Sequence, residues 1–160
     1  MALVIELLDG RRHSRSGFAC GEPVLDDYLR YRAVQPQRDG IATTHVLVDS
    51  VCASQVLGYC SLATAQMHLS ELRAADRKRL SAYPVPALRM GRLAIASHAQ
   101  GQGRGQLLLG HAVNLALSVR QTMGVRVLLV DAKHAQAAAF YERYGFRPTA
   151  SQTLTLYLGV

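Results

Sequence analysis

The feature that most constrains the fold is a glycine-rich turn between a predicted strand and a predicted helix. The segment HAQGQGRGQLLLG covers residues 98–110 and follows the apolar run Leu88–Ile95. Leucines follow Gly105 almost at once, and apolar residues from Leu108 to Val119 recur at i, i+4, i+7 and i+11, the spacing of one buried helix face. The turn therefore opens a helix and is not a flexible linker.

Such a turn is suited to binding an anion. The first turn of a helix leaves four backbone N–H groups unpaired at the positive end of the helix dipole. Glycines allow φ above zero and place no Cβ between these groups and a ligand, so a diphosphate fits there. The sequence lacks the Gly-Lys-Ser/Thr of a P-loop and the third glycine of the dinucleotide fingerprint. Alone, the glycines predict either a phosphate site or an ordinary tight turn.

Composition fits one globular domain with a basic surface. The chain has 160 residues, is 49% hydrophobic and has a formal net charge of +7, which favours polyanionic partners, although a GC-rich genome would produce the same excess of arginine. The cysteines and histidines show no metal-ligand spacing, so we expect no metal site. No apolar run approaches the ~20 residues that span a bilayer. Without a signal-peptide pattern, we expect a cytoplasmic protein and no membrane contact.

Strands and helices alternate along the rest of the chain. We predict strands at Ala2–Leu8, Thr43–Asp49, Val56–Met67, Leu88–Ile95, Val125–Asp131 and within Phe146–Leu158. We predict helices at Glu22–Val34, Ser70–Leu80, from the glycine turn to Gly124, and at Ala135–Tyr144. The first helix would bury a face formed by Val24, Leu25, Tyr28, Leu29 and Tyr31. This order predicts an α/β or α+β fold with a single domain over residues 1–160.

The stretches GRLAIASHAQGQGRGQLLLGHAV, VLLVDA and AAAFYERYGF together resemble the GCN5-related N-acetyltransferases, the GNAT family. In that family a Q/R-x-x-G-x-G/A turn after a central strand holds the diphosphate of acetyl-CoA. The stretches FACGEPVLDDYLRYRAVQ, VLGYCSLA and YPVPALRMGRLA resemble, more narrowly, the acetyltransferase toxins of bacterial type II toxin–antitoxin systems. The resemblance covers nearly the whole chain. It implies a mixed central sheet with a splayed strand pair, flanked by helices.

The resemblance also implies which residues bind acetyl-CoA or coenzyme A. The backbone of Leu93, Ala94 and Ile95 would pair with the pantetheine arm. The N–H groups of Gln100, Gly101, Gln102, Gly103, Arg104 and Gly105 would hold the diphosphate, with Arg104 adding a charge-assisted contact. Phe140 is assigned either to this site or to aromatic packing.

Tyr141 is the general acid that the resemblance implies. A phenol with a pKa near ~10 is protonated at neutral pH and can donate to a leaving thiolate. A general base is harder to find, because Asp131 ends a strand and Glu142 lies on another helix face. An enzyme without a strong base should prefer α-amines, since about one in seven is neutral at pH 7, against about one lysine in 2,500.

The toxin resemblance implies aminoacyl-tRNA as acceptor, a ribbon-helix-helix antitoxin as partner, and a homodimer. Basic residues ahead of the turn would line a tRNA groove: Arg11, Arg12, Arg15, Arg30, Arg32, Arg38, Arg73, Arg77, Lys78, Arg79, Arg89 and Arg92. Among them we assign Arg92, Arg77 and Arg32 to substrate binding. Two alternatives stay open: a housekeeping acetyltransferase acting on a small amine or a protein N-terminus, and a non-catalytic nucleic-acid-binding or assembly module.

Overall fold

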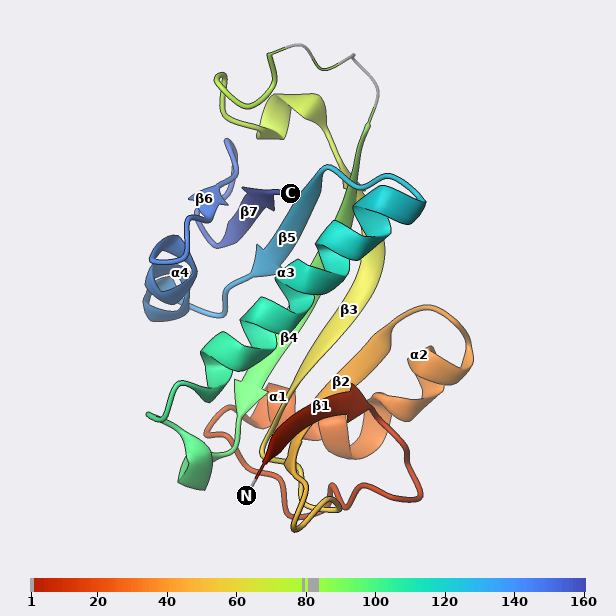
Figure 1. The fold of residues 1–160 in the computed structure, drawn as a ribbon. Coiled ribbons are helices and arrows are strands. Elements are labelled where there is room, and N and C mark those ends of the chain that lie inside the picture. The colour runs from red at the N-terminus through yellow and green to blue at the C-terminus, as the bar shows by residue number, and fades with distance from the viewer. Residues whose placement is uncertain (1, 79, 81–83) are drawn as a thin grey trace. The chain divides into compact units, whose positions relative to one another are not determined.

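A computed structural model describes residues 2–78, 80 and 84–160 of the chain (Figure 1). The strands of the described residues are β1 (Leu3–Leu7), β2 (Thr43–Asp49), β3 (Gly58–Met67), β4 (Val85–Ile95), β5 (Val127–Asp131), β6 (Arg147–Pro148) and β7 (Thr155–Gly159). The α-helices are α1 (Pro23–Asp27), α2 (Val34–Arg38), α3 (Arg104–Thr122) and α4 (Ala135–Glu142). The strands form a mixed sheet in the order β1-β2-β3-β4-β5-β7-β6, as the predicted fold class requires.

The chain divides into two compact units. The first consists of Met1–Ala63 and Arg92–His111, and the second of Thr64–Gly91 and Ala112–Val160. Both β3 and β4 run from one unit into the other, as does α3. The glycine-rich turn therefore belongs to the first unit and α4 to the second.

In the first unit, β2 pairs antiparallel with both β1 and β3, which confirms the predicted hairpin. Val46 and Val48 of β2 are completely buried, and so is Leu29 from the helical segment that begins at Pro23. Figure 1 shows this segment, which includes α1 and α2 and connects the end of β1 to the start of β2. Burial of these aliphatic side chains is the main source of stability in this unit.

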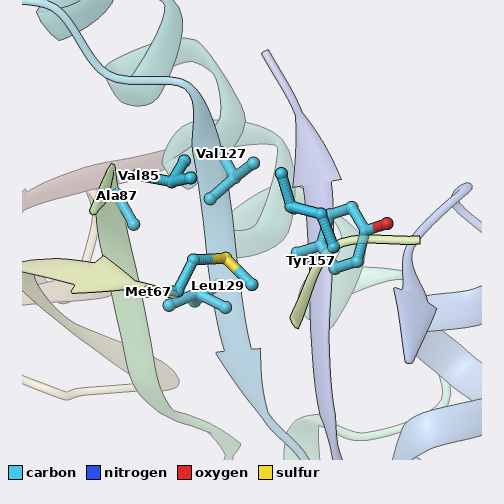
Figure 2. Packing of buried hydrophobic residues seen from close by; sticks show 7 residues of the cluster. Met67, Val85, Ala87, Val127, Leu129 and Tyr157 are labelled. Carbon is cyan, nitrogen blue, oxygen red and sulfur yellow. The ribbon is translucent and has the colours of Figure 1, made fainter. Parts of the chain in front are cut away.

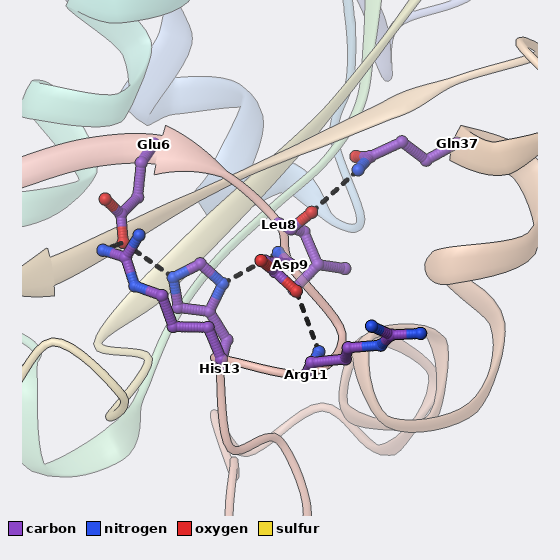
Figure 3. Close-up of polar contacts among 7 residues, drawn as sticks. Glu6, Leu8, Asp9, Arg11, His13 and Gln37 are labelled. Carbon is purple, nitrogen blue, oxygen red and sulfur yellow. Dashed lines mark hydrogen bonds and ion pairs between the residues drawn. The ribbon is translucent and has the colours of Figure 1, made fainter.

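The end of β1 is held by a network of polar contacts (Figure 3). The backbone N–H of Asp9 donates to Nδ1 of His13 at 2.9 Å, so the ring proton must lie on Nε2, which contacts Glu6 Oε1 at 2.7 Å. This hydrogen bond is the largest cause that lowers the pKa of Glu6. Gln37 of α2 donates to the carbonyl of Leu8 at 2.8 Å. The network fixes the start of the arginine-rich loop that follows β1.

The predicted helix Glu22–Val34 is only partly correct. Two short helices are separated by a π-helical turn at Tyr28–Arg32, and the helical segment continues to Arg38. The i→i+5 bond from the Ala33 N–H to the Tyr28 carbonyl adds a residue to the turn and shifts the helix face. Consequently Tyr28 and Leu29 are buried as predicted, whereas Tyr31 is 76% exposed. Val24, predicted on the same face, is 79% exposed.

In the second unit, β5 pairs in parallel with β4 and antiparallel with β7. Figure 2 shows its apolar core, in which side chains from β3, β4, β5 and β7 meet. The buried residues of this cluster are Met67, Leu72, Val85, Ala87, Val127, Leu129 and Tyr157. The predicted strand Val125–Asp131 is confirmed as β5, and its first four residues are buried, as expected for a strand that is covered on both faces.

The predicted helix Ser70–Leu80 is wrong. The described residues of this segment form a 3₁₀ turn at Leu69–Glu71, followed by turns. The hydroxyl of Tyr157 accepts the backbone N–H of Arg73 at 2.8 Å and donates to Asp76 at 2.5 Å. These long-range bonds take the place of the local bonds a helix would need. Of the AYPVP stretch that was expected to end this helix, Ala82 and Tyr83 lie outside the described residues, and Val85 and Pro86 begin β4.

Candidate active site

Beyond the residues that pair with β5, strand β4 continues into the candidate site. The two strands pair from Ala87↔Val127 to Met90↔Val130, and β4 continues to Ile95. The backbone of Leu93–Ile95 thus lies past the last β5 partner, where the resemblance implies that a pantetheine arm would pair. This register agrees with the predicted splayed strand pair. The role of these three residues stays a prediction.

The glycine turn has the geometry of an anion cradle. Gly101 and Gly103 adopt φ of +77° and +76°, and a Cβ built on either would meet nothing within 4 Å. Among the described residues, the backbone N–H groups of Gly101, Gln102 and Gly103 donate to no protein acceptor. The first N–H groups of α3, from Arg104 onward, add the free donors of a helix start. Open space above converging amides fits a diphosphate.

Gln100 acts through its side chain, a role that the sequence did not indicate. Its Nε2 donates to the carbonyls of Cys20 and Ile95, both at 2.9 Å. Its backbone N–H already points to the Ser97 carbonyl at 3.5 Å, so Gln100 contributes less to the amide cradle than predicted. The side chain instead ties the loop before α1 to the end of β4. The Q-x-x-G-x-G pattern shows where the glutamine lies in the turn but not what its side chain contacts, since the partner Cys20 comes from a distant part of the chain.

Gly58 is a second residue that sequence reasoning missed. A Cβ at this position would lie 2.6 Å from Ile95 Cδ1 and 2.9 Å from the Ala94 carbonyl oxygen. The neighbouring carbonyl of Leu57 accepts the N–H of Ala96 at 2.8 Å. Only glycine permits this close approach of β3 to the end of β4. The signal available in the sequence was an isolated glycine in the strand pattern VLGYCSLA.

The predicted general acid lies in the second unit. Tyr141 is at the end of α4, is 4% exposed, and its ring packs 5.4 Å from that of Phe140 and 5.7 Å from that of Phe146. His134 caps α4 by accepting the N–H of Ala137 at 3.1 Å. Phe140 also contacts the Tyr144 ring at 5.2 Å, so aromatic packing accounts for its position. The roles of Tyr141 and Phe140 toward the cofactor remain predictions.

Several arginines that were predicted to face tRNA are engaged within the protein. Arg89 binds both oxygens of Asp131 at 2.6 Å, and Arg12 pairs with Glu6. These contacts use one donor of Arg12 and two of Arg89, and both side chains remain partly exposed, so their assignment to tRNA phosphates stays a prediction. Arg15 donates to the carbonyl of Leu29 at 3.2 Å. The predicted Arg79 lies outside the described residues.

The predicted substrate-binding arginines differ from these. Arg32 and Arg77 are exposed, and among the described residues the side chain of neither takes part in a hydrogen bond or an ion pair. Arg92 is half-buried, and its guanidinium carbon lies 3.6 Å from the centroid of the Tyr28 ring. Arg32 and Arg92 belong to the first unit with the glycine turn, whereas Arg77 belongs to the second with Tyr141.

Two half-buried histidines of the first unit lie side by side. Nε2 of His111 on α3 lies 3.0 Å from Nδ1 of His45 on β2, and Thr43 Oγ1 contacts the other nitrogen of His45 at 3.1 Å. Burial, followed by the charge of His111, lowers the pKa of His45 to about 4. Burial also lowers the pKa of His111. Within the described ranges, no three His, Cys, Asp or Glu side chains gather to hold a metal ion.

The parallel pairing of β4 with β5 up to Met90 and the glycine turn at the start of α3 agree with the arrangement expected of an acyl-CoA-dependent acyltransferase. A sequence profile of the acetyltransferase (GNAT) domain matches residues 42–148. The chain therefore belongs to the GNAT acetyltransferase family and is an N-acetyltransferase. In the part of the chain that the structure describes, no helix is long and apolar enough to cross a membrane.

Relatives narrow the class further. The chain is 32% identical over 143 residues to the tRNA-acetylating toxin of Mycobacterium tuberculosis, covering 89% of this chain and 84% of that protein. It is similar to the structure of AtaT complexed with acetyl-methionyl-tRNAfMet, with a TM-score of 0.92, 30% identity, and coverage of 99% of this chain and 95% of that one. A Tyr-to-Phe mutant of the AtaT toxin bound to the C-terminus of the antitoxin AtaR and acetyl-CoA matches with a TM-score of 0.83 and 31% identity, covering 98% and 92% of the two chains.

Proposed function

We propose that this protein is an acetyl-CoA-dependent toxin that acetylates the α-amino group of aminoacyl-tRNA and thereby blocks translation. The observation that carries the proposal is the similarity, over 99% of the chain, to AtaT in complex with acetyl-methionyl-tRNAfMet. The net charge of +7 suits a polyanionic acceptor. The housekeeping and non-catalytic alternatives have no comparable support among the relatives.

The first unit binds the donor. The amides of Gly101–Gly103 and of the first turn of α3 hold the diphosphate, and Arg104 adds its charge. The backbone of Leu93–Ile95, beyond the reach of β5, hydrogen-bonds the pantetheine arm as a neighbouring strand would. Acetyl-CoA supplies a thioester whose acetyl group passes to the acceptor amine. Gln100 and Gly58 keep the end of β4 in place for this binding.

Tyr141 donates the proton that the leaving sulfur requires. A phenol can donate a proton at neutral pH, because its ordinary pKa of about 10 keeps it protonated there. Packing of its ring against Phe140 and Phe146 fixes the direction of the hydroxyl. Phe140 serves this packing.

The chain works as one GNAT domain over residues 1–160, as a homodimer in the cytoplasm, and a ribbon-helix-helix antitoxin restrains it. Support for the antitoxin comes from the AtaT relative bound to the C-terminus of its antitoxin AtaR. Support for the single domain comes from the strands β3 and β4, each of which contributes residues to both compact units.

The test is acetyl transfer from labelled acetyl-CoA to matched pools of charged and uncharged tRNA. We expect label on charged tRNA alone, and loss of that label after mild alkaline hydrolysis of the aminoacyl ester. Label on neither pool, with transfer to a small amine or a protein N-terminus, would replace the toxin proposal with the housekeeping alternative. Y141F provides the matched control, because it keeps the aromatic ring and removes only the hydroxyl.

A further inference from the structure

Arg92 sits at the end of a stack of aromatic rings in the first unit. The ring of Phe18 meets Tyr59 edge-on with centroids 5.7 Å apart, and Tyr59 stacks on Tyr28 at 6.3 Å with an interplanar angle of 17°. The Arg92 guanidinium covers Tyr28, its carbon 3.6 Å from the ring centroid. The hydroxyl of Tyr59 donates to the carbonyl of Leu25 at 2.8 Å, which anchors the stack to α1.

The stack holds the guanidinium in place without using its donors. A guanidinium carries its five N–H groups in its own plane, so stacking on a ring leaves them free at the edges. Among the described residues, no hydrogen bond or ion pair engages the Arg92 side chain. Arg89, three residues earlier on β4, differs because Asp131 satisfies it at 2.6 Å. Arg92 is therefore a pre-positioned cation with unused donors.

The stack contributes no anion that would satisfy Arg92. Burial raises the pKa of the Tyr59 phenol above its ordinary value, so this hydroxyl stays protonated. The buried carboxylate of Asp26 accepts the backbone N–H of Cys20 at 2.8 Å and forms no ion pair with Arg92. The guanidinium of Arg92, which is half-buried, is therefore available to acceptor oxygens from outside the stack.

The position of Arg92 on β4 indicates which ligand this is. At a rise of about 3.3 Å per residue, the Cα of Arg92 lies about 10 Å along the strand from that of Ile95. Arg92 thus precedes the segment assigned to the pantetheine arm, at the end of that segment farther from the glycine turn. The diphosphate of the donor belongs to residues 101–105, so it does not reach Arg92. The remaining candidate ligand of Arg92 is the acceptor, which approaches the acetyl end of the donor. The formal anion nearest to the amine of an aminoacylated RNA end is the phosphodiester on the 5′ side of the terminal adenosine.

We propose that Arg92, held by Tyr28, binds this last phosphodiester of the acceptor strand and so places the aminoacyl ester at the acetyl group. This inference rests on the proposed function, since it assumes an aminoacyl-RNA acceptor. Arg92 is then a substrate-binding residue and Tyr28 a positioning residue. Arginine suits the task because its planar donor fork matches two phosphate oxygens.

The test compares two truncated acceptors that carry the same amino acid: aminoacyl-adenosine, which has no phosphate, and aminoacyl-cytidylyl-adenosine, which has one phosphodiester. For the wild type, we expect kcat/KM to be about 10- to 100-fold higher with the dinucleotide, the worth of a charge-assisted bidentate contact. R92Q should abolish that ratio, because it should lower kcat/KM for the dinucleotide more than kcat/KM for aminoacyl-adenosine. As a binding readout, uncharged cytidylyl-adenosine should inhibit the wild type more strongly than R92Q.

Variants at Tyr28 separate positioning from folding. Y28F keeps the ring under the guanidinium and should preserve the dinucleotide-to-nucleoside ratio, whereas Y28L should lower it. R32Q is the matched control: it removes an exposed arginine of the same unit and should weaken transfer to whole tRNA with no effect on that ratio. A ratio unchanged in R92Q, or an equal loss on both acceptors, overturns the inference while acetylation of charged tRNA still stands. Transfer to no aminoacylated acceptor by the wild type overturns the proposed function itself.

Discussion

The replacement Gly103→Ala tests the amide cradle most directly. Gly103 has a φ of +76°, and a Cβ built there meets no heavy atom within 4 Å, so the cost to folding is backbone strain alone. A left-handed conformation costs a non-glycine residue about 1–2 kcal/mol. At about 2–4 °C per kcal/mol for a chain of this length, we expect the melting temperature to fall by about 2–8 °C.

The effect on coenzyme A should be larger than the effect on folding. The new methyl group would lie in the open space that the diphosphate occupies, and relaxation of φ would turn at least one amide away from it. Loss of one charge-assisted hydrogen bond, worth about 1.5–3 kcal/mol, raises Kd by about 10- to 150-fold. Isothermal titration with coenzyme A measures this, and circular dichroism in the absence of ligand measures the melting temperature.

Gly124→Ala is the matched control, because Gly124 follows α3, has a φ of +85° and also has open space around its Cβ position. It should lower the melting temperature by the same amount and leave coenzyme A binding unchanged. Equal affinity of the two variants for coenzyme A would refute the assignment of the diphosphate to residues 101–105.

Three further outcomes are expected. Y141F should lower kcat about 10²-fold with unchanged coenzyme A affinity and melting temperature; an unaltered kcat would exclude Tyr141 as the acid. G58A should destabilise the fold by about 1–3 kcal/mol, because its Cβ would lie 2.9 Å from a backbone oxygen. G110A is the control: this position is helical and a Cβ there meets nothing, so the change should be neutral or stabilising. Equal melting temperatures of the two variants would contradict the close approach at Gly58. In the folded protein the pKa of His45 is lowered to about 4, and the pKa of His111 is also lowered. The unfolded chain therefore binds protons that the folded protein does not, so the free energy of unfolding should fall as the pH drops from 6.5 toward 4. H45Q should flatten the slope of melting temperature against pH between 7 and 5, and an unchanged slope would exclude the histidine pair as its source.

Local sequence patterns predicted most of the sheet, since strands and the long helix depend on periodicities of 2 and 3.6 that neighbouring residues set. Val127–Asp131 and Thr43–Asp49 match within two residues. The failures occur where distant residues decide. The segment after Ser70 forms turns because the hydroxyl of Tyr157 bonds to Arg73 and Asp76. The π-helical turn at Tyr28–Arg32 changes which side chains are buried, and no propensity encodes it.

Residues of the candidate site were found or missed from sequence for the same reason, namely whether their contacts are local or distant. The glycine turn was found from sequence because its chemistry is local: positive φ, absent Cβ and a helix start lie within a few residues. Gly58 and the Gln100 side chain were missed, since each acts on the end of β4 through contacts from elsewhere in the chain. Charge counting likewise did not indicate which arginines pair with carboxylates of the protein. Arg89 shows why, because a carboxylate on the next strand takes up its charge.

The pairing of Arg89 with Asp131 also bears on the acceptor. Both oxygens of Asp131, the acid at the end of β5, accept from Arg89 at 2.6 Å, so this carboxylate is engaged in a bidentate ion pair. Glu142, the other acid near Tyr141, is exposed to solvent. An acetyl transfer in which neither group acts as a base requires an amine that arrives neutral. At pH 7 about one α-amine in seven satisfies this condition, against about one lysine in 2,500. A transfer without a general base therefore favours an α-amino acceptor over a lysine side chain.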